Sequence, residues 1–549
     1  MSVDAITLEV FNHRLAAIAD EMGLTLCRSA FSPNIKERRD FSCALFDARG
    51  AMVAQAAHIP VHLGSTPLSV RAAIERVPMA PGDVVMLNDP YAGGTHLPDV
   101  TVVAPVFLPG ERVPFAYVAN RAHHADIGGG TPGSMPLATD IYAEGLRVPP
   151  VRIVARGKIV AAVLCLFLAN TRVADERRGD LLAQFAALRR GARRVREVVE
   201  RAGRRMTRAA MATLQDYSAR LMSATLRRLP PGVYRAEDWM DDDGAGTSHI
   251  PLRVTVRVGR GHVTVDFTGT AAQVAGSINA NFAVTTAAVL YVFQSLAGST
   301  IPANAGLMRP VRIIAPPGSL VNAAFPAAVA GGNVETSQRI VDVVLKALVP
   351  AAPQRIPAAS SGSMNNLALG GHDPFRHRAF AYYETFAGGA GAGPHGPGAS
   401  GVHTHMTNTL NTPIEALEAG YPLRVVRYAL RTGSGGGGRH RGGEGVVREL
   451  EVLASERVTL VTERRRLRPY GLAGGRAGRA GRNLLVTKGK VRTLPAKTSF
   501  TARAGDRVRI MTPGGGGWGG GPPGGGPPPP PRPQHFDRAV RVARLERGH

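Results

Sequence analysis

The stretch VVMLNDPYAGGTHLPDVTVVAPVF, residues 84–107, gives the first view of how this chain folds. Two apolar runs of strand length, one at each end, enclose a loop of glycine, proline and polar residues. Apolar runs of this length with turn-forming residues at their ends are typical of buried strands. The loop carries His96 and two carboxylates, Asp89 and Asp99. The stretch therefore predicts a sheet with potential metal ligands at its edge.

Apolar periodicity elsewhere completes a mixed α/β pattern. Residues 8–29 repeat apolar side chains at spacings of three and four, which predicts an amphipathic helix. A second helical block, rich in alanine and arginine, is expected from about 180 to 228 with an interruption near Gly203. Other short apolar runs predict strands at 41–46, 51–54 and 115–119.

The length of 549 residues predicts a multidomain α+β protein, because one compact core rarely holds so long a chain. After Pro230 the apolar residues alternate as in half-buried strands, and two helices are expected at 281–297 and 334–348. The last third is glycine-rich, with short strands predicted at 446–453, 457–462 and 507–510. We expect an N-terminal α/β region with the metal site (1–229), a middle α+β region (230–380), a Gly-rich β region (381–519) and a flexible Pro/Gly-rich basic tail (520–549).

The formal net charge of +25 would suit a nucleic-acid-binding protein, but the pattern of charges does not. The basic residues are nearly all arginines spread along the chain. No helix-turn-helix, zinc finger or aromatic RNA-binding motif accompanies them. We therefore expect no nucleic-acid partner.

Composition also predicts the cellular compartment. The three cysteines form no CxxC pair, which favours a reducing compartment over a disulfide framework. The sequence contains no apolar stretch of about 20 residues and no recognisable signal peptide. A cytoplasmic protein with no membrane partner is the expectation.

Histidines and aspartates gather in the first 130 residues. Besides the loop that carries His96, the segment RAHHADIGGG (121–130) follows a predicted strand, and Asp40 opens another. Imidazole and carboxylate groups together suit Zn, Mn or Fe(II), and a four-ligand set leaves room for a water molecule that the ion can acidify. We expect the metal ligands Asp40, His96, His123 and Asp126.

Two further residues are candidate catalytic groups. His124 should point away from its neighbour His123 and could transfer protons, and Asp89 lies in the quoted loop. Asp99 is an additional carboxylate candidate. A histidine beside glycine is more often an ordinary loop residue than a ligand, so the pattern leaves both interpretations open. The segments His403-Thr-His405 and Asp241–Gly244 are weaker metal candidates.

These and other segments resemble the hydantoinase B/oxoprolinase family, which includes the B subunits of N-methylhydantoinases and relatives of ketone carboxylase subunits. The resemblance runs in order over about residues 5–518. It is carried by Arg38–Ser42, His58–Gly64, Asn88–Asp99, His123–Gly129, Glu144–Arg147, Asp266–Thr270, Gly331–Ser337, His405–Pro413, Arg441–Gly445 and Thr512–Trp518.

The resemblance implies a hetero-oligomeric enzyme. The expected partner is a hydantoinase A-type subunit with an actin-like fold, which uses ATP with Mg to phosphorylate the lactam or imide oxygen. The chain itself is then expected to hold the divalent metal beside the activated carbonyl, where the ring C–N bond opens. The resemblance supports Asp and His ligands from the segments that contain Asp40, His96, His123 and Asp126. The choice between His123 and His124 stays open.

Two other functions fit the same sequence. In the first, the chain is a subunit of an ATP-dependent ketone carboxylase that joins an activated ketone to CO₂. In the second, it is a non-catalytic scaffold for the A-type subunit and holds no stoichiometric metal. We expect the first-named function, an ATP-dependent hydrolase of cyclic amides such as hydantoins or 5-oxoproline.

Overall fold

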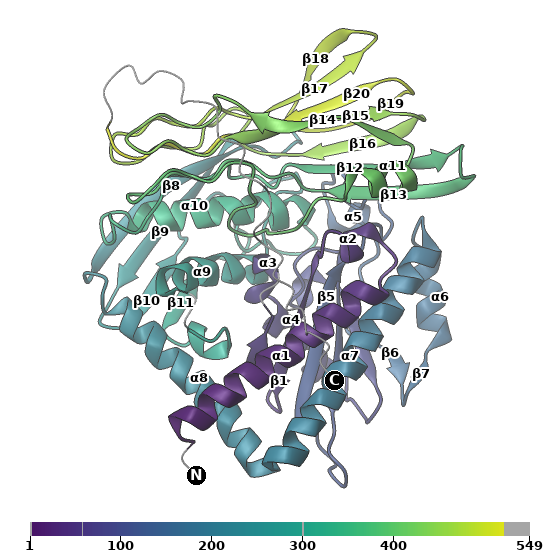
Figure 1. Cartoon of the computed structure of the whole chain (residues 1–549), viewed down its shortest axis with the longest axis vertical. Coiled ribbons are helices and arrows are strands. Elements are labelled where there is room, and N and C mark those ends of the chain that lie inside the picture. The colour runs from purple at the N-terminus through teal and green to yellow at the C-terminus, as the bar shows by residue number, and fades with distance from the viewer. Residues whose placement is uncertain (1–2, 57–58, 299–300, 521–549) are drawn as a thin grey trace, which may run out of the picture.

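The computed structural model describes residues 3–56, 59–298 and 301–520 (Figure 1). The fold is mixed α/β, as expected, and contains four sheets. A seven-stranded sheet and a four-stranded sheet lie side by side in the lower part of Figure 1, and two further sheets form a lobe above them. The expected tail falls outside the described residues from 521 onward.

The seven-stranded sheet is formed by the N-terminal region, in the order β2-β1-β5-β4-β3-β6-β7. Every pairing in it is antiparallel, so the start of one strand lies beside the end of its neighbour. Both central strands, β4 and β5, are buried along their whole length. The strands are β1 Phe41–Asp47, β2 Met52–Gln55, β3 Val84–Leu87, β4 Asp99–Val106, β5 Ala116–His123, β6 Val151–Ala155 and β7 Lys158–Ile159.

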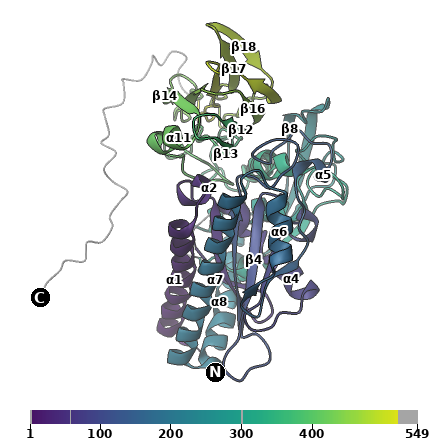
Figure 2. The same cartoon turned by 90° about the vertical axis from the view of Figure 1, so that its right-hand side faces the viewer.

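Long helices cover one face of this sheet and a shorter helix covers the other. Helices α1 (Ala5–Ser29), α7 (Ala174–Ala202) and α8 (Arg204–Leu226) run next to one another in Figure 2. Their apolar stripes share a core with β4 and β5, while α4 (Thr66–Arg76) packs on the opposite face. The break between α7 and α8 is at Gly203, whose φ of 84° ends the helix as the sequence predicted. The shorter helices are α2 Pro33–Lys36, α3 Pro60–Leu63, α5 Ile141–Glu144 and α6 Ala161–Ala169.

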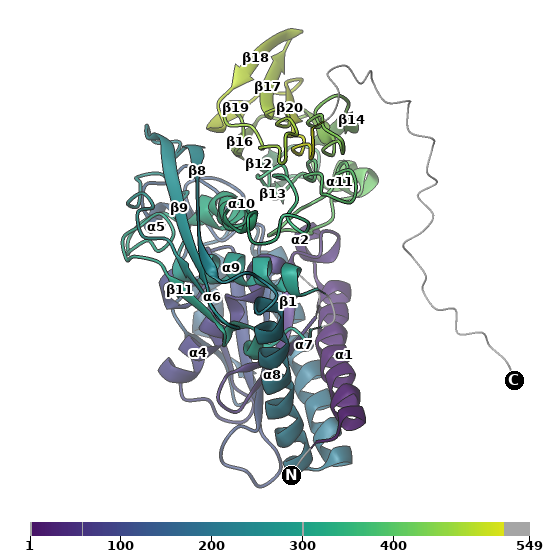
Figure 3. The same cartoon turned by 90° about the vertical axis from the view of Figure 1, so that its left-hand side faces the viewer.

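The middle region forms a four-stranded sheet in the order β11-β10-β9-β8. The buried positions of β9 alternate with exposed ones, as the sequence predicts. Figure 3 shows β8 and β9 at the outer edge, with α9 (Phe282–Ala297) and α10 (Ser337–Leu348) on their inner side. A π-helical turn, Gly332–Thr336, leads into α10. The strands are β8 Gly232–Asp242, β9 Ser248–Val258, β10 Val263–Asp266 and β11 Val311–Ile314.

The C-terminal lobe packs a four-stranded sheet, β13-β12-β16-β19, against a five-stranded sheet, β14-β15-β20-β17-β18. The expected boundary at 380 falls inside β13, whose partner β12 already belongs to this lobe. The lobe's one α-helix among the described residues is α11 (Ile414–Gly420). Its strands are β12 Asn366–Asp373, β13 Arg378–Glu384, β14 Leu423–Arg431, β15 Gly445–Val452, β16 Glu456–Val461, β17 Arg482–Thr487, β18 Lys490–Leu494, β19 Lys497–Ala502 and β20 Arg507–Met511.

Glycine-rich segments of this lobe pack backbone against backbone. A Cβ atom on Gly443 would lie 1.9 Å from the carbonyl oxygen of Ala399, and one on Gly515 would lie 1.9 Å from that of Ala390. Only glycine permits such an approach, which accounts for the glycine content near the C-terminus. Among the described helices, none has the length and apolar character needed to cross a membrane.

Candidate metal centre

The antiparallel pairing of β4 and β5 brings two candidate ligands together. Asp99, the first residue of β4, lies directly opposite His123, the last residue of β5. Both side chains are buried, at 1% and 3% exposure. Two residues before His123, and so on the same face of the strand, Arg121 donates hydrogen bonds to Ser65 and Ser69 beside α4. The pair therefore lies on the α4 face of the sheet.

His96 joins this pair from the loop that precedes β4. Its Nε2 lies 3.2 Å from Oδ1 of Asp99, and Nδ1 of His123 lies 3.4 Å from the same oxygen. The side-chain amide of Asn88 donates to the carbonyl of Leu97 at 2.8 Å, and that of Asn281 donates to the carbonyl of Thr95 at 2.7 Å. These bonds hold the loop over the strand ends. The three side chains offer ligand atoms that all lie within 4.8 Å of one another.

The donor atoms of this cluster fit a divalent cation. Both ring nitrogens of His96 and Nε2 of His123 are buried and make no hydrogen bond. A buried nitrogen without a partner costs free energy, and coordination to a cation would remove this cost. Imidazole nitrogen and carboxylate oxygen are ligands that Zn, Mn and Fe(II) share. The residues present therefore suit such an ion.

The protonation states of the cluster also suit a cation. Burial by itself would raise the pKa of Asp99, but attraction to His96 and His62 holds this pKa well below its usual value. Burial lowers the pKa of His123, against the attraction of Asp99 and Asp40. At neutral pH the carboxyl group is thus ionised and the His123 ring is neutral. These are the forms that bind metal.

Side chains outside the cluster fix the carboxylate of Asp99. Its Oδ2 accepts a hydrogen bond from Thr95 Oγ1 at 2.5 Å and lies 3.3 Å from Nε2 of His62, in α3. The other ring nitrogen of His62 is 2.9 Å from the hydroxyl of Ser42. Oδ2 is therefore anchored, while Oδ1 faces the two histidines. The sequence analysis did not single out His62, although it lies in a segment that carries the family resemblance.

Asp40 lies close to the cluster but is not one of its three members. Its carbonyl oxygen accepts a hydrogen bond from the backbone N–H of His123 at 3.0 Å. Its carboxylate is 3.9 Å from the guanidinium of Arg38 and raises the pKa of His123. The side chain is 10% exposed and remains a candidate fourth ligand.

The structure does not bring Asp126, an expected ligand, into the cluster. Its carboxylate accepts hydrogen bonds from the backbone N–H groups of Gly128 at 3.0 Å and Gly133 at 3.3 Å. Arg172 donates to it twice, from its backbone N–H at 3.1 Å and from its guanidinium at 2.9 Å. These donors already occupy the carboxylate, so we assign Asp126 to the folding of the loop and place Asp99 in the proposed ligand set.

The two candidate catalytic groups also lie apart from the cluster. His124 points to the α7 face, where its Nε2 is 3.0 Å from Oε1 of Gln184 and its ring packs edge-on against Phe167. Burial lowers the pKa of His124 to about 4, so the ring stays neutral. Asp89 caps the 3₁₀ turn Pro90–Ala92 and accepts from Arg147 at 3.0 Å. Both geometries indicate structural roles, and of the adjacent pair of histidines only His123 reaches the cluster.

The C-terminal lobe supplies one wall of the site. The ring of Tyr383, in β13, stacks on His123 with 4.5 Å between centroids and 12° between planes. Arg38 lies against the same tyrosine, with its guanidinium carbon 5.1 Å from the ring centroid. Tyr383 donates to Oδ1 of Asn366 at 2.7 Å, which fixes the ring. No local sequence pattern singles out Tyr383, because the contact joins segments about 260 residues apart.

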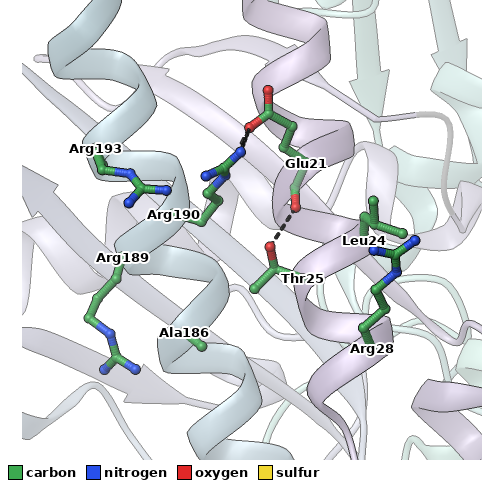
Figure 4. Close-up of a pocket in the computed structure, with 8 residues that line it drawn as sticks. All are labelled: Glu21, Leu24, Thr25, Arg28, Ala186, Arg189, Arg190 and Arg193. Carbon is green, nitrogen blue, oxygen red and sulfur yellow. Dashed lines mark hydrogen bonds and ion pairs between the residues drawn. The ribbon is translucent and has the colours of Figure 1, made fainter. Parts of the chain in front are cut away.

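The other candidates from the sequence lie elsewhere. His405 is 3.4 Å from Asp342, at the side of α10. Asp241 accepts hydrogen bonds from the backbone N–H groups of residues 465–467 and not from a cation. A groove of about 650 Å³ between α1 and α7 is lined by four arginines, and Arg190 pairs with Glu21 at 2.7 Å (Figure 4). This groove lies on the α7 side of the sheet, away from Asp99.

The fold and the His/Asp cluster are those of a known family. Residues 4–521 match the hydantoinase B/oxoprolinase model, and the chain belongs to this family. The chain is 42% identical over 541 residues to 5-oxoprolinase 1 of Arabidopsis thaliana, covering 93% of the chain and 41% of that protein. It is 34% identical over 500 residues to a putative B-type D-/L-hydantoinase subunit of a Pseudomonas strain, covering 87% and 83%. The ATP-dependent caprolactamase of Pseudomonas jessenii superposes with a TM-score of 0.89 at 32% identity, covering 95% and 92%.

Two facts about these relatives bear on the assembly. The chain spans about two fifths of the length of the plant 5-oxoprolinase, so the larger part of that relative has no counterpart here. The name of the hydantoinase relative describes one subunit of a larger enzyme. Relatives of this chain thus occur both as part of longer chains and as separate subunits.

Proposed function

We propose that this chain is the metal-dependent subunit of an ATP-dependent enzyme that opens cyclic amides of the hydantoin or 5-oxoproline type. The observation that carries the proposal is the buried cluster of His96, Asp99 and His123, in which three of the four imidazole nitrogens lack hydrogen-bond partners. The names of the relatives, 5-oxoprolinase, hydantoinase and caprolactamase, support a cyclic amide as substrate.

A divalent ion held by this cluster supplies a Lewis acid that polarises a carbonyl group and acidifies water. The chain's own residues prepare the site for it. Asp99 carries the negative charge, and Thr95 and His62 fix its orientation. Tyr383 holds the plane of the His123 ring and shields one side of it from solvent. The burial of the cluster keeps bulk water away from the reacting centre and strengthens these electrostatic interactions.

ATP use belongs to a partner in this proposal. The sequence contains no GxxxxGK[ST] phosphate-binding loop. An unstrained lactam is stabilised by amide resonance, so its ring opening is close to balance without coupling to ATP. A hydantoinase A-type subunit would phosphorylate the ring oxygen and make the ring carbon electrophilic. This chain would then open the C–N bond at its metal centre.

Reconstitution tests the proposal. The chain, loaded with Zn, Mn or Fe(II), is mixed with its A-type partner and ATP. Candidate substrates are hydantoin, N-methylhydantoin, 5-oxoproline and caprolactam, and acetone with bicarbonate probes carboxylation. We expect ATP-dependent ring opening of a cyclic amide. His96→Ala should abolish ring opening while part of the partner's ATP turnover remains, and His372→Ala, at an exposed position, should leave both unchanged. Full ring opening by His96→Ala would refute the proposal.

A further inference from the structure

We propose that the A-type partner docks on an apolar surface formed by α6 and the aromatic pair Tyr142 and Phe325, named here the α5/α6 surface. The inference rests on the proposed function, because it assumes a partner that delivers an activated substrate. It adds the place on this chain where that partner binds.

Helix α6 is apolar around its whole circumference, yet it lies at the surface. Its sequence AAVLCLFLA, residues 161–169, has no charged or polar hydrogen-bonding side chain, and only Phe167 is buried. Leu166 is 63% exposed, and Ile159, just before the helix, is 41% exposed. A helix with such a sequence is normally buried on all sides. This surface therefore suits contact with another protein.

The second half of the surface is aromatic. Tyr142, in α5, is 65% exposed, and Phe325 is 45% exposed. Their rings pack edge to face with centroids 5.9 Å apart. The guanidinium carbon of Arg147 lies 4.9 Å from the centroid of Phe325. Exposed aromatic rings beside arginine are the side chains that contribute most to protein–protein binding.

A single loop joins the two halves to the candidate metal centre. Residues 126–130 start three positions after His123 and lie between the ends of α6 and α5. A Cβ on Gly128 would lie 2.4 Å from the carbonyl oxygen of Asn170, and one on Gly129 would lie 2.5 Å from that of Glu144. Figure 2 turns this side towards the viewer, with α6 at the centre and α5 to its upper right. A protein bound here would therefore border the strand end that carries His123.

Two observations favour the A-type partner over a second copy of this chain. In the plant 5-oxoprolinase, which this chain covers to 41%, most of the polypeptide lies outside the shared part and must pack against some face of it. The net charge of +25 also opposes close self-association. An activated substrate is best transferred where the two active centres lie close together, and the α5/α6 surface borders the metal centre.

Charge introduced into this surface tests the inference. The double variant Tyr142→Glu/Leu166→Glu is compared with Val113→Glu/Phe375→Glu, whose side chains are exposed to similar extents of 64% and 63%. Val113 lies in the turn between β4 and β5, at the opposite end of these strands from Asp99 and His123. We measure the affinity for the purified A-type partner by calorimetry, the metal content, and the mass of each variant alone by sedimentation.

We expect the first double variant to bind the partner at least about tenfold more weakly than wild type, with unchanged metal content, and the second to bind as wild type does. Ring opening by the first variant should recover when the partner concentration is raised. Equal partner affinity of the two variants would overturn the inference. A wild-type dimer that dissociates in the first variant would also overturn it, because the surface would then join two copies. Failure of the proposed function would be seen separately, as a wild-type complex that forms but opens no cyclic amide.

Discussion

Asp99 and His123 face each other across the β4–β5 pair, with Oδ1 of the aspartate 3.4 Å from Nδ1 of the histidine. The register of two buried strands sets this separation, so the two groups are held in place before any ion binds. His96 approaches the same carboxylate oxygen from the loop that leads into β4. A rigid sheet edge with one flanking loop is a favourable scaffold for a preorganised cation site.

His62→Ala should weaken metal binding without abolishing it. His62 contacts Oδ2 of Asp99 at 3.3 Å and thereby orients the proposed ligand. Loss of such an orienting group typically lowers metal affinity about 10- to 100-fold. Competition with a chromophoric chelator measures the affinity, and His13→Ala, whose side chain is 77% exposed, is the control. Identical affinities in the two variants would show that His62 does not orient the ligand.

Asp126→Asn separates the two possible ligand sets. The variant loses the ion pair with Arg172 at 2.9 Å and an acceptor for backbone N–H groups. We expect the metal to be retained and the free energy of unfolding to fall by about 1–3 kcal/mol. Metal analysis and denaturant unfolding measure the two effects. Loss of metal with unchanged stability would restore Asp126 as a ligand.

The stability of the protein should depend on the ionisation of Glu144. Burial raises the pKa of Glu144 to about 8 from its ordinary value of 4.5, against hydrogen bonds from the N–H groups of Ala330 and Val329. Between these two values the folded protein holds a proton that the unfolded chain has released. The free energy of unfolding therefore falls as the pH rises through this window.

Glu144→Gln removes this titration and keeps a side-chain carbonyl as acceptor. Its stability relative to wild type should rise from pH 5 to pH 8, by up to about 1.4 kcal/mol for each pH unit. Urea unfolding at several pH values measures this difference. Parallel pH profiles of wild type and variant would show that Glu144 does not titrate as described.

The glycine packing of the C-terminal lobe should tolerate no side chain at its centre. In Gly443→Ala the added Cβ would lie 1.9 Å from the carbonyl oxygen of Ala399, so the backbone must move. We expect a loss of about 3 kcal/mol or more in the free energy of unfolding. Gly396→Ala is the control, because its Cβ would meet no atom within 4 Å. Similar stability of both variants would contradict the close packing.

Local patterns in the sequence predict most of this fold. The apolar stripe of α1 and the alternation in β9 each reflect one buried face, so periodicity was enough to predict them. The boundary expected at 380 falls inside β13, because β12 and β13 form a hairpin that no change in composition marks. The π-helical turn before α10 has no sequence signal of its own.

The candidate site could be predicted only in part. His96 and His123 lie in the cluster because both flank predicted strands, where ligands are expected. The choice between Asp99 and Asp126 depended on the pairing of β4 with β5, and strand pairing is not visible in one sequence. The carboxylate of Asp126 is instead occupied by Arg172, 46 residues further on. Tyr383 could not be foreseen for the same reason, since its contact with His123 is made by tertiary packing.

Metal analysis of the purified chain tests the central claim most directly. Wild type and Asp99→Asn are reconstituted with Mn, Zn or Fe(II), desalted and measured by elemental analysis. We predict about one divalent ion per chain in wild type and nearly none in Asp99→Asn, with both proteins folded by circular dichroism. A folded Asp99→Asn variant that holds as much metal as wild type, or a wild-type chain that binds none of these ions, would contradict the account.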